Sequence, residues 1–221
     1  MTGLVDLLVV MTTDSAAYAA SISALTDVID NATAIISGSL ATPPEAPTPC
    51  AEFDVETLRS HLQAVILRIN AMGQGRPAVS VPELVPASDP VAAWREAAAQ
   101  TAGLWAARDP QSLVRAPWRE LPTIEAAEIY AAEVVCHTWD LAAASGQSYD
   151  IDEQIAEVCE RAYQREIPAE SRREIFDAAA TQMPAGVPWS DPFGPAVPVA
   201  EGARNIDRVV ALSGRDPAWR A

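Results

Sequence analysis

Apolar residues recur three or four positions apart along most of the chain, which is the spacing that places side chains on one face of an α-helix. Asp and Ser residues before such stripes are good helix caps, Pro is favoured in the first helical turn, and Gly often follows the last turn. These signals predict four long helices: one over about residues 14–37 with Thr13 or Asp14 as its cap, one from the cap Asp54 to Gly73, one that starts at Pro90, and one from Pro122 to Gly146.

After residue 150 the helical stripes become shorter. Two short helices are expected over about 151–166 and 170–180, and a final helix is stopped by Gly214. Residues 109–121 carry apolar anchors between prolines and charges, which predicts an irregular crossover with a short strand. We therefore expect an all-α fold: a four-helix bundle over residues 14–150, preceded by an extension over residues 1–13 and followed by a helical and loop region over residues 151–221 that packs on the bundle.

The charge of the chain excludes several functions. The formal net charge is −15, so the surface repels phosphate groups, and neither nucleic acid nor an anionic membrane is an expected partner. All 15 cationic residues are arginine. Without lysine the protein can form neither a Schiff base with a substrate nor a phosphate-binding loop of the lysine type.

The three cysteines, Cys50, Cys136 and Cys159, bear on the compartment. Their number is odd and none are spaced as CxxC, so a disulfide framework is not expected and a reducing cytoplasm is the simpler interpretation. The apolar start, MTGLVDLLVV, contains an acidic residue and no basic segment, so it is not read as a signal peptide. No run of about 18 apolar residues predicts a transmembrane helix. We expect a cytoplasmic monomer or homodimer.

The two histidines of the chain both fall on apolar helix faces. Glu133 and His137 are four residues apart, so they share a face of the fourth predicted helix, and Asp140 continues that line. His61 lies within the apolar stripe of the second predicted helix. A carboxylate among apolar neighbours is costly unless it is paired or bound to a metal.

Two imidazoles and one carboxylate form a ligand set that leaves a position of a divalent metal open, which is the pattern of catalytic rather than structural sites. Zinc is the first choice, and nickel, iron or manganese would accept the same ligands. The alternative is that each histidine is a hydrogen-bonded core residue, because an ExxxH pair is common on helices. The HExxH signature of helical metalloproteases is absent, so peptide hydrolysis is not supported.

Three stretches carry a resemblance to a known family: TPCAEFDVETLRSHL, EVVCHTWDLAAASGQ and DRVVALSGRDPAW. Together they resemble the mycothiol-dependent maleylpyruvate isomerase-like proteins of actinobacteria, within the DinB-like metal-binding superfamily, over about residues 14–219. The resemblance implies a four-helix bundle that holds a divalent ion, usually zinc. It also implies that His61, Glu133 and His137 are the ligands.

The resemblance further implies a metal-dependent S-transferase or isomerase, in which a small-molecule thiol of the mycothiol type reacts with a small electrophile. This chain departs from the family in having Phe53 where Trp is usual, and in a C-terminal part that is short for a true maleylpyruvate isomerase. Two other functions stay open. One is a non-enzymatic metal- or small-ligand-binding bundle, and the other is an enzyme of specialised metabolism on the same fold without thiol chemistry.

Three further residues are candidates for catalysis or binding, each with a structural alternative. Asp140 either orients a metal ligand from behind or pairs with an arginine. Arg68 either binds a carboxylate of cofactor or substrate, or reaches the surface over a buried stem. Tyr130 either donates a proton and lines the pocket, or packs in the core.

Other conspicuous residues have structural interpretations. Cys136 points about 100° away from His137 on the helix, and Cys50 is read as a packing residue rather than a nucleophile. Trp189 and Phe193 lie in a Pro-rich loop. They either close over the site as a lid or hold this loop against the bundle. The GRDPAW tail is read as a helix stop and turn that closes the chain.

Overall fold

In the computed structural model, which describes residues 2–181 and 193–220, helices make up most of the protein. The helices of the described residues are α1 (Thr2–Gly38), α2 (Val55–Gly73), α3 (Pro90–Ala106), α4 (Thr123–Ala144), α5 (Glu153–Glu166), α6 (Arg172–Thr181) and α7 (Asn205–Leu212), with short 3-10 helices η1 (Ser39–Ala41) and η2 (Ala78–Ser80). Two antiparallel strands, β1 (Leu113–Arg115) and β2 (Glu120–Pro122), form a hairpin between α3 and α4. The expected all-α class is confirmed, and the expected short strand is part of this hairpin.

Side-chain caps explain why several helices begin where the sequence predicts. The carboxylate of Asp54 accepts a hydrogen bond from the backbone N–H of Thr57 at 2.8 Å. Asp89 caps α3 in the same way through Ala92, at 2.9 Å, and Asp152 caps α5. Each cap satisfies an amide that the first helical turn leaves without a partner inside the helix.

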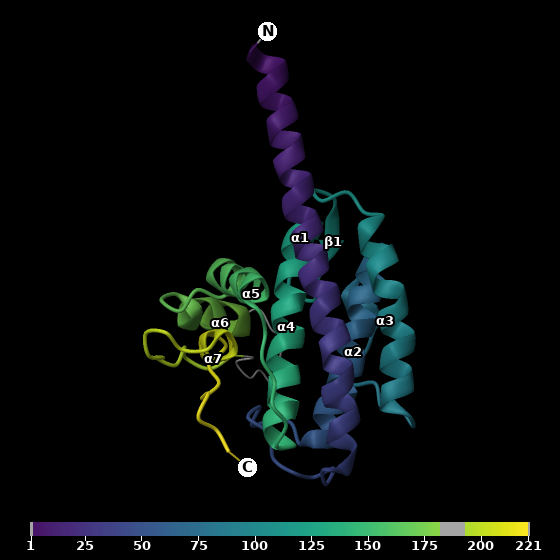
Figure 1. Cartoon of the computed structure of the whole chain (residues 1–221), viewed down its shortest axis with the longest axis vertical. Coiled ribbons are helices and arrows are strands. Elements are labelled where there is room, and N and C mark those ends of the chain that lie inside the picture. The colour runs from purple at the N-terminus through teal and green to yellow at the C-terminus, as the bar shows by residue number, and fades with distance from the viewer. Residues whose placement is uncertain (1, 182–192, 221) are drawn as a thin grey trace.

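The first helix is longer than expected, because α1 begins at Thr2. The potential caps Thr13 and Asp14 lie inside it. A capping side chain sets a helix start only where the preceding backbone leaves the helical conformation, and the preceding stretch MTGLVDLLVV contains no proline to break the helix. The expected separate extension over residues 1–13 is thus helical from Thr2 and continuous with α1, whose first turns project past the other helices (Figure 1).

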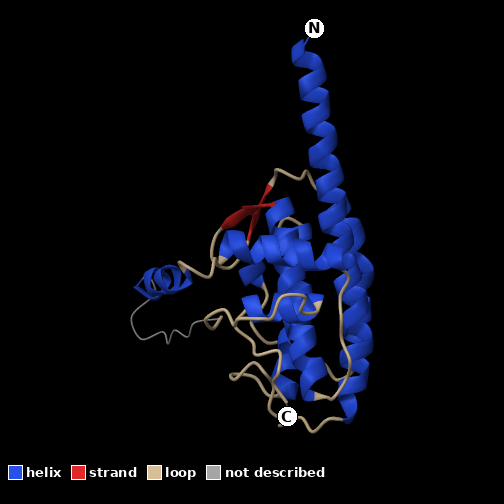
Figure 2. Ribbon diagram, turned by 60° about the vertical axis from the view of Figure 1, so that its left-hand side comes forward, coloured by secondary structure: helices blue, strands red, loops and turns tan. Residues whose placement is uncertain are grey.

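The four long helices pack side by side, α1 against α3 and α4, and α2 against the same two helices (Figures 1 and 2). Two buried tryptophans of α3 fix this arrangement. Trp94 Nε1 donates to the carbonyl of Ile29 in α1 at 3.0 Å, and Trp105 Nε1 donates to the carbonyl of Ile69 in α2 at 3.1 Å. Each tryptophan therefore joins two helices through apolar contact and a hydrogen bond.

The segment between α2 and α3, residues 74–89, turns back along α2, and we call it the return segment. The carbonyl of Val81 accepts a hydrogen bond from Arg68 Nε at 3.3 Å, and the amide of Val85 donates to the carbonyl of Ser60 at 3.0 Å. Later residues of the return segment thus lie beside earlier residues of α2. As the colours of Figure 1 show, α4 runs in the opposite direction to α2.

The region after residue 150 packs on α4 through α5 and α7. Glu128, buried in α4, accepts hydrogen bonds from Arg161 and Arg165 of α5, each at 2.7 Å. Past α7 the tail of the chain returns to α4, where Arg215 meets Asp140. Within the described residues, none of the helices combines the length and the apolar character needed to cross a membrane.

Candidate metal centre

Three side chains with metal-ligating atoms converge between α2 and α4. His61, Glu133 and His137 each place one such atom within 4.8 Å of those of the other two. The Nε2 atom of His61 lies 3.7 Å from Oε1 of Glu133, and the two imidazole rings have centroids 4.8 Å apart at an interplanar angle of 79°. The packing of α2 on α4 therefore brings together the three residues that the sequence pattern selected.

These separations suit a divalent ion. Donor atoms at about 2.0–2.2 Å from a tetrahedral ion lie about 3.3–3.6 Å from one another. The 3.7 Å between His61 and Glu133 is close to that range. The three side chains could therefore hold a metal ion after a small closure, with at least one position left for an external ligand.

Each histidine is held from behind at its Nδ1 atom. Nδ1 of His61 lies 3.2 Å from the carbonyl oxygen of Glu83 in the return segment, and Nδ1 of His137 lies 3.1 Å from Oδ2 of Asp140. Both partners are hydrogen-bond acceptors, so they keep the proton of a neutral imidazole on Nδ1 and leave the lone pair on Nε2. That is the tautomer in which Nε2 can bind an ion.

The charges around the site favour the forms that bind a metal. Burial by itself opposes ionisation of Glu133, but the neighbouring His61, His137 and Arg68 outweigh it, so the pKa of the carboxyl lies below its ordinary value. Burial lowers the pKa of His137, against the opposing effect of its bond with Asp140. At neutral pH the site therefore presents a carboxylate beside a neutral imidazole.

Asp140 makes both of the contacts that the sequence left as alternatives. Its buried carboxylate contacts His137 through Oδ2, and it pairs with Arg215, whose Nε lies 3.3 Å from Oδ1 and whose Nη2 lies 3.1 Å from Oδ2. Burial opposes ionisation of Asp140, but the charge of Arg215 and the bond with His137 hold its pKa below the ordinary value. The interpretation of GRDPAW as a closing turn missed this contact, because the two residues are 75 positions apart.

Phe53 covers the histidines, with its ring centroid 4.9 Å from that of His61 and 6.3 Å from that of His137. Phe53 therefore packs against His61 and lies close to His137. The side chains of His61 and His137 are 8% and 11% exposed, whereas that of Glu133 is 20% exposed. Solvent therefore reaches the site beside Glu133.

Arg68 and Tyr130 lie on the two helices of the site, but within the described residues no hydrogen bond or ion pair joins either of them to the three ligands. Arg68 is half-buried and bonds to Val81. Tyr130 is buried, and its ring stacks on that of Trp118 at 6.2 Å and 21°. Burial, reinforced by the charge of Glu133, raises the pKa of Tyr130 well above its ordinary value, so its hydroxyl is a neutral donor.

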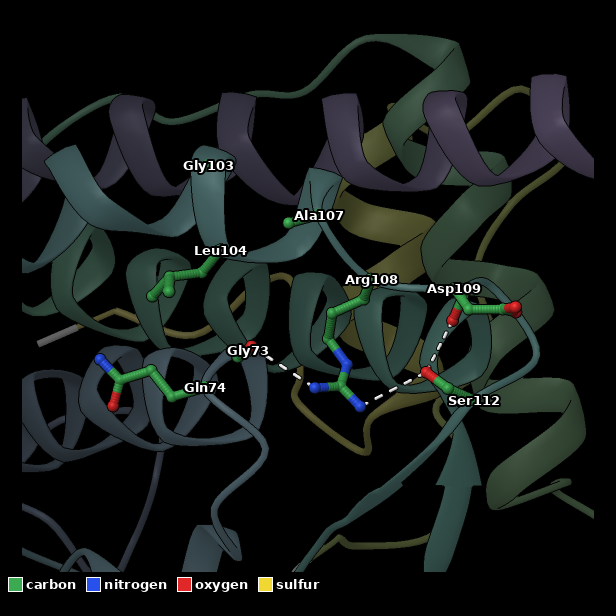
Figure 3. A pocket seen from close by; sticks show the side chains of 8 residues that line it. All are labelled: Gly73, Gln74, Gly103, Leu104, Ala107, Arg108, Asp109 and Ser112. Carbon is green, nitrogen blue, oxygen red and sulfur yellow. Dashed lines mark hydrogen bonds between the residues drawn. The ribbon is translucent and has the colours of Figure 1, made fainter.

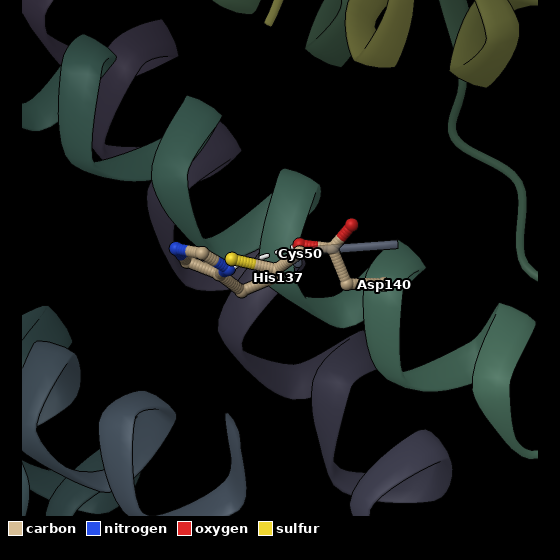
Figure 4. A group of neighbouring side chains, drawn as sticks. All are labelled: Cys50, His137 and Asp140. Atoms are coloured by element: carbon tan, nitrogen blue, oxygen red, sulfur yellow. Dashed lines mark hydrogen bonds and ion pairs between the residues drawn. The ribbon is translucent and has the colours of Figure 1, made fainter. Parts of the chain in front are cut away.

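Cys50 is a neighbour of the site that the sequence analysis did not include. Its Sγ atom lies within 4.8 Å of a ring nitrogen of His137 and a carboxylate oxygen of Asp140 (Figure 4). Burial raises the pKa of this thiol to about 11, with Arg215 acting in the opposite direction, so it is protonated at neutral pH. The TPC motif places Cys50 before α2, but only the fold shows which α4 residues it faces.

Two other regions lie apart from the ligands. The ring of Phe193 packs edge-on against that of Tyr163 at 5.8 Å and lies under the guanidinium of Arg215 at 5.9 Å, which favours the interpretation that it holds its loop against the helices. Trp189, the other residue of that interpretation, lies outside the described residues.

A surface hollow of about 410 Å³ lies where α2 and α3 end, lined in part by Gly73, Arg108 and Ser112 (Figure 3). Gly73 is about 18 Å along α2 from His61, so this hollow is not the metal centre.

The site and the fold define an all-α protein with a candidate metal centre between two of its helices. No protein-family model matches the chain. Two uncharacterized proteins from two strains of Mycobacterium tuberculosis are 34% identical to it over 112 residues, which is 50% of this chain and 59% of each relative. The chain thus spans less than two thirds of the length of these relatives, and no solved structure matches it.

Proposed function

We propose that this protein is a four-helix bundle of the DinB-like type that binds a divalent ion and transfers a small-molecule thiol to a small electrophile, or isomerises that electrophile through the thiol. The observation that carries the proposal is the convergence of His61, Glu133 and His137 with both Nδ1 atoms already bonded to acceptors. A core histidine needs only one such bond. Here Nε2 of His61 also lies 3.7 Å from the Glu133 carboxylate, and a ligand atom of His137 lies within 4.8 Å of both, which supports a cation site.

Zinc is the ion that this ligand set suits best, since two imidazoles and one carboxylate with an open position are typical of catalytic zinc. A bound divalent ion would lower the pKa of a coordinating thiol, so that the thiolate is available at neutral pH. A thiol of the mycothiol type in a reducing cytoplasm is consistent with the three free cysteines of the chain.

The residues around the ligands would support this reaction in distinct ways. Asp140 keeps His137 in the required tautomer and orientation, and Arg215 holds Asp140. The thiol loses its proton to solvent and its sulfur forms a bond to the electrophilic carbon. In transfer, a leaving group departs with its electron pair or the attacked molecule gains a proton. In isomerisation, the new carbon–sulfur bond breaks again after rotation, and its electron pair returns to the sulfur. The neutral hydroxyl of Tyr130 is a candidate donor of that proton.

Two measurements test the proposal. Protein purified without chelator is analysed for bound metal, together with His61→Ala and His137→Ala. We expect close to one ion per chain in the parent and little in either variant, because each loses a ligand. Conjugation of mycothiol to bromobimane should then exceed the uncatalysed rate with the parent and not with the variants. Equal metal in all three proteins would disprove the ligand assignment.

A non-enzymatic metal-binding protein is the second candidate, and Cys50 is the observation that favours it. A thiolate from Cys50 would close the coordination shell if it joined the ion, and a closed shell is typical of structural sites. Cys50 approaches His137 but does not belong to the group formed by His61 and Glu133. In a cobalt-loaded protein without added thiol, a sulfur-to-metal absorption band that disappears in Cys50→Ser would favour this candidate over the enzyme.

A further inference from the structure

Arg68 differs from most other buried or half-buried arginines, because it has no carboxylate partner among the described residues. The chain has 30 acidic residues and 15 arginines, and Arg165, Arg208 and Arg215 all pair with carboxylates. Within the described residues Arg68 makes one bond, from Nε to the carbonyl of Val81, and no carboxylate oxygen lies within 4.0 Å of it. Its two terminal nitrogens are therefore available to an external anion.

Two parts of the chain limit the distance between the guanidinium of Arg68 and the imidazole of His61. Along α2, Arg68 is seven residues after His61, a rise of about 10 Å. Along the return segment, its partner Val81 is two residues from Glu83, whose carbonyl bonds to His61, and two residues span at most about 7 Å. With the hydrogen bonds of 3.3 Å and 3.2 Å at its two ends, this path and the rise along α2 place the guanidinium within about 10–13 Å of the imidazole. A carboxylate that bonds to the guanidinium at about 3 Å would therefore lie about 7–10 Å from the metal ligands.

Tyr130 and Trp118 lie in the same direction from the ligands. Because α4 runs opposite to α2, Tyr130, one turn before Glu133, is displaced toward the Arg68 end of the site. The hydroxyl of Tyr130 has no hydrogen-bond partner among the described residues. Trp118 stacks on its ring and is 51% exposed. An aromatic wall and a hydroxyl donor therefore lie on the α4 side, and the guanidinium lies on the α2 side.

We propose that Arg68, with the Tyr130 hydroxyl, forms a carboxylate-binding subsite of the metal centre. Its ligand is a small thiol or electrophile whose carboxylate lies about 7–10 Å from the atom that meets the ion. This inference rests on the proposed function, because it assigns a substrate class to that site. A guanidinium binds a carboxylate through two parallel charge-assisted hydrogen bonds, so the subsite should raise affinity by about 10- to 100-fold over an uncharged ligand of equal length.

The experiment uses the full chain loaded with cobalt(II), in which thiol coordination gives a sulfur-to-metal absorption band. The probes are 6-mercaptohexanoate, whose sulfur and carboxylate are about 8 Å apart when extended, and 6-mercaptohexanol, which is of equal length and uncharged. We expect the carboxylate thiol to bind the parent at least about tenfold more tightly. That preference should disappear in Arg68→Gln, persist in part in Arg68→Lys, and persist fully in Arg95→Gln, which changes an exposed arginine of α3.

The outcomes separate this inference from the proposed function. Equal affinity of the parent for both probes, or a preference that survives Arg68→Gln, overturns the subsite and leaves the thiol function standing. If neither probe gives the band in a protein that has bound cobalt, the thiol function fails and the subsite fails with it. Circular dichroism of Arg68→Gln, together with its affinity for the uncharged probe, shows whether the variant keeps its fold and metal centre.

Discussion

Glu128 and Glu133 lie five residues apart on α4, yet their surroundings differ. Glu128 is 4% exposed and accepts hydrogen bonds from Arg161, Arg165 and Ser21, so permanent positive charges satisfy both of its oxygens. Glu133 has a more exposed side chain and faces two histidines, with no arginine within ion-pairing distance among the described residues.

The difference shows which of the two carboxylates is suited to bind a cation. A carboxylate bonded to two guanidiniums gains nothing from a cation, because its charge is already compensated. A carboxylate that faces two imidazoles and no guanidinium has an incomplete environment that a divalent ion would complete. Burial of a glutamate is therefore not a signal of function; the partner groups decide between a structural link from α4 to α5 and a ligand.

The largest expected effect is on metal binding in Glu133→Gln. Loss of partners behind a ligand typically costs about 10- to 100-fold in metal affinity, so loss of the ligand itself should cost at least about 100-fold. Competition titration against a chromophoric chelator measures this. Glu128→Gln is the matched control and should change the affinity by less than about threefold. Equal affinities of the two variants would contradict the contrast between the two carboxylates.

The contrast should reverse when the stability of the metal-free protein is measured. Glu128→Gln leaves Arg161 and Arg165 without their shared carboxylate, and we expect a loss of about 2–3 kcal/mol, reduced from the value for a fully buried pair because Arg161 is half-exposed. Glu133→Gln should change the stability by less than about 1 kcal/mol, because no arginine pairs with this carboxylate among the described residues. Urea denaturation of both variants checks this, and a larger loss in Glu133→Gln would refute it.

Removal of support behind His137 should have a smaller effect on metal binding than removal of a ligand. We expect Asp140→Asn and Arg215→Met each to lower metal affinity by about 10- to 30-fold, because the imidazole loses its orienting carboxylate or that carboxylate loses its counter-charge. Arg215→Lys keeps the charge and should recover part of the affinity. If Arg215→Met bound the metal with the same affinity as the parent, Arg215 would have no role at the metal centre.

Acidification should remove the stabilisation that Asp140 provides. Its folded-state pKa lies below the ordinary 3.8, so its contribution is fully present above that value and is lost as the pH falls through the folded-state pKa. The difference in unfolding free energy between the metal-free parent and Asp140→Asn should therefore narrow as the pH falls from 6 to 3. A difference that stays constant would show that the pKa of Asp140 is the same in the folded and the unfolded protein.

The smallest effect is expected for Cys50→Ser. Cys50 lies near His137 but outside the group that includes His61 and Glu133, and its thiol is protonated at neutral pH. Metal affinity should stay within about twofold of the parent, as expected for a residue that is not a ligand. A tenfold loss in the same chelator competition would mean that the thiol binds the ion.

The sequence was most informative where a local pattern carries the physical cause. Apolar spacing with the cap Asp54 and with Pro90 at the start of a helix predicted α2 and α3 closely, because a cap acts within one helical turn, and apolar spacing alone predicted α5. The start of α1 was wrong, because Thr13 and Asp14 offer the same local signal inside a helix as at its end. The four-residue spacing of Glu133 and His137 likewise defined a shared helix face.

By itself, then, the sequence determined the helical class, most helix boundaries and the line of Glu133, His137 and Asp140 along one helix, since these depend on residues within a few positions of one another. The tertiary structure decided which groups meet across the chain: His61 with Glu133, the Glu83 carbonyl with His61, Arg215 with Asp140, and Cys50 with His137. Within residues 2–181 and 193–220, it also left Arg68 without a carboxylate partner. Such pairings follow from how helices and loops pack, and no spacing within one helix encodes them.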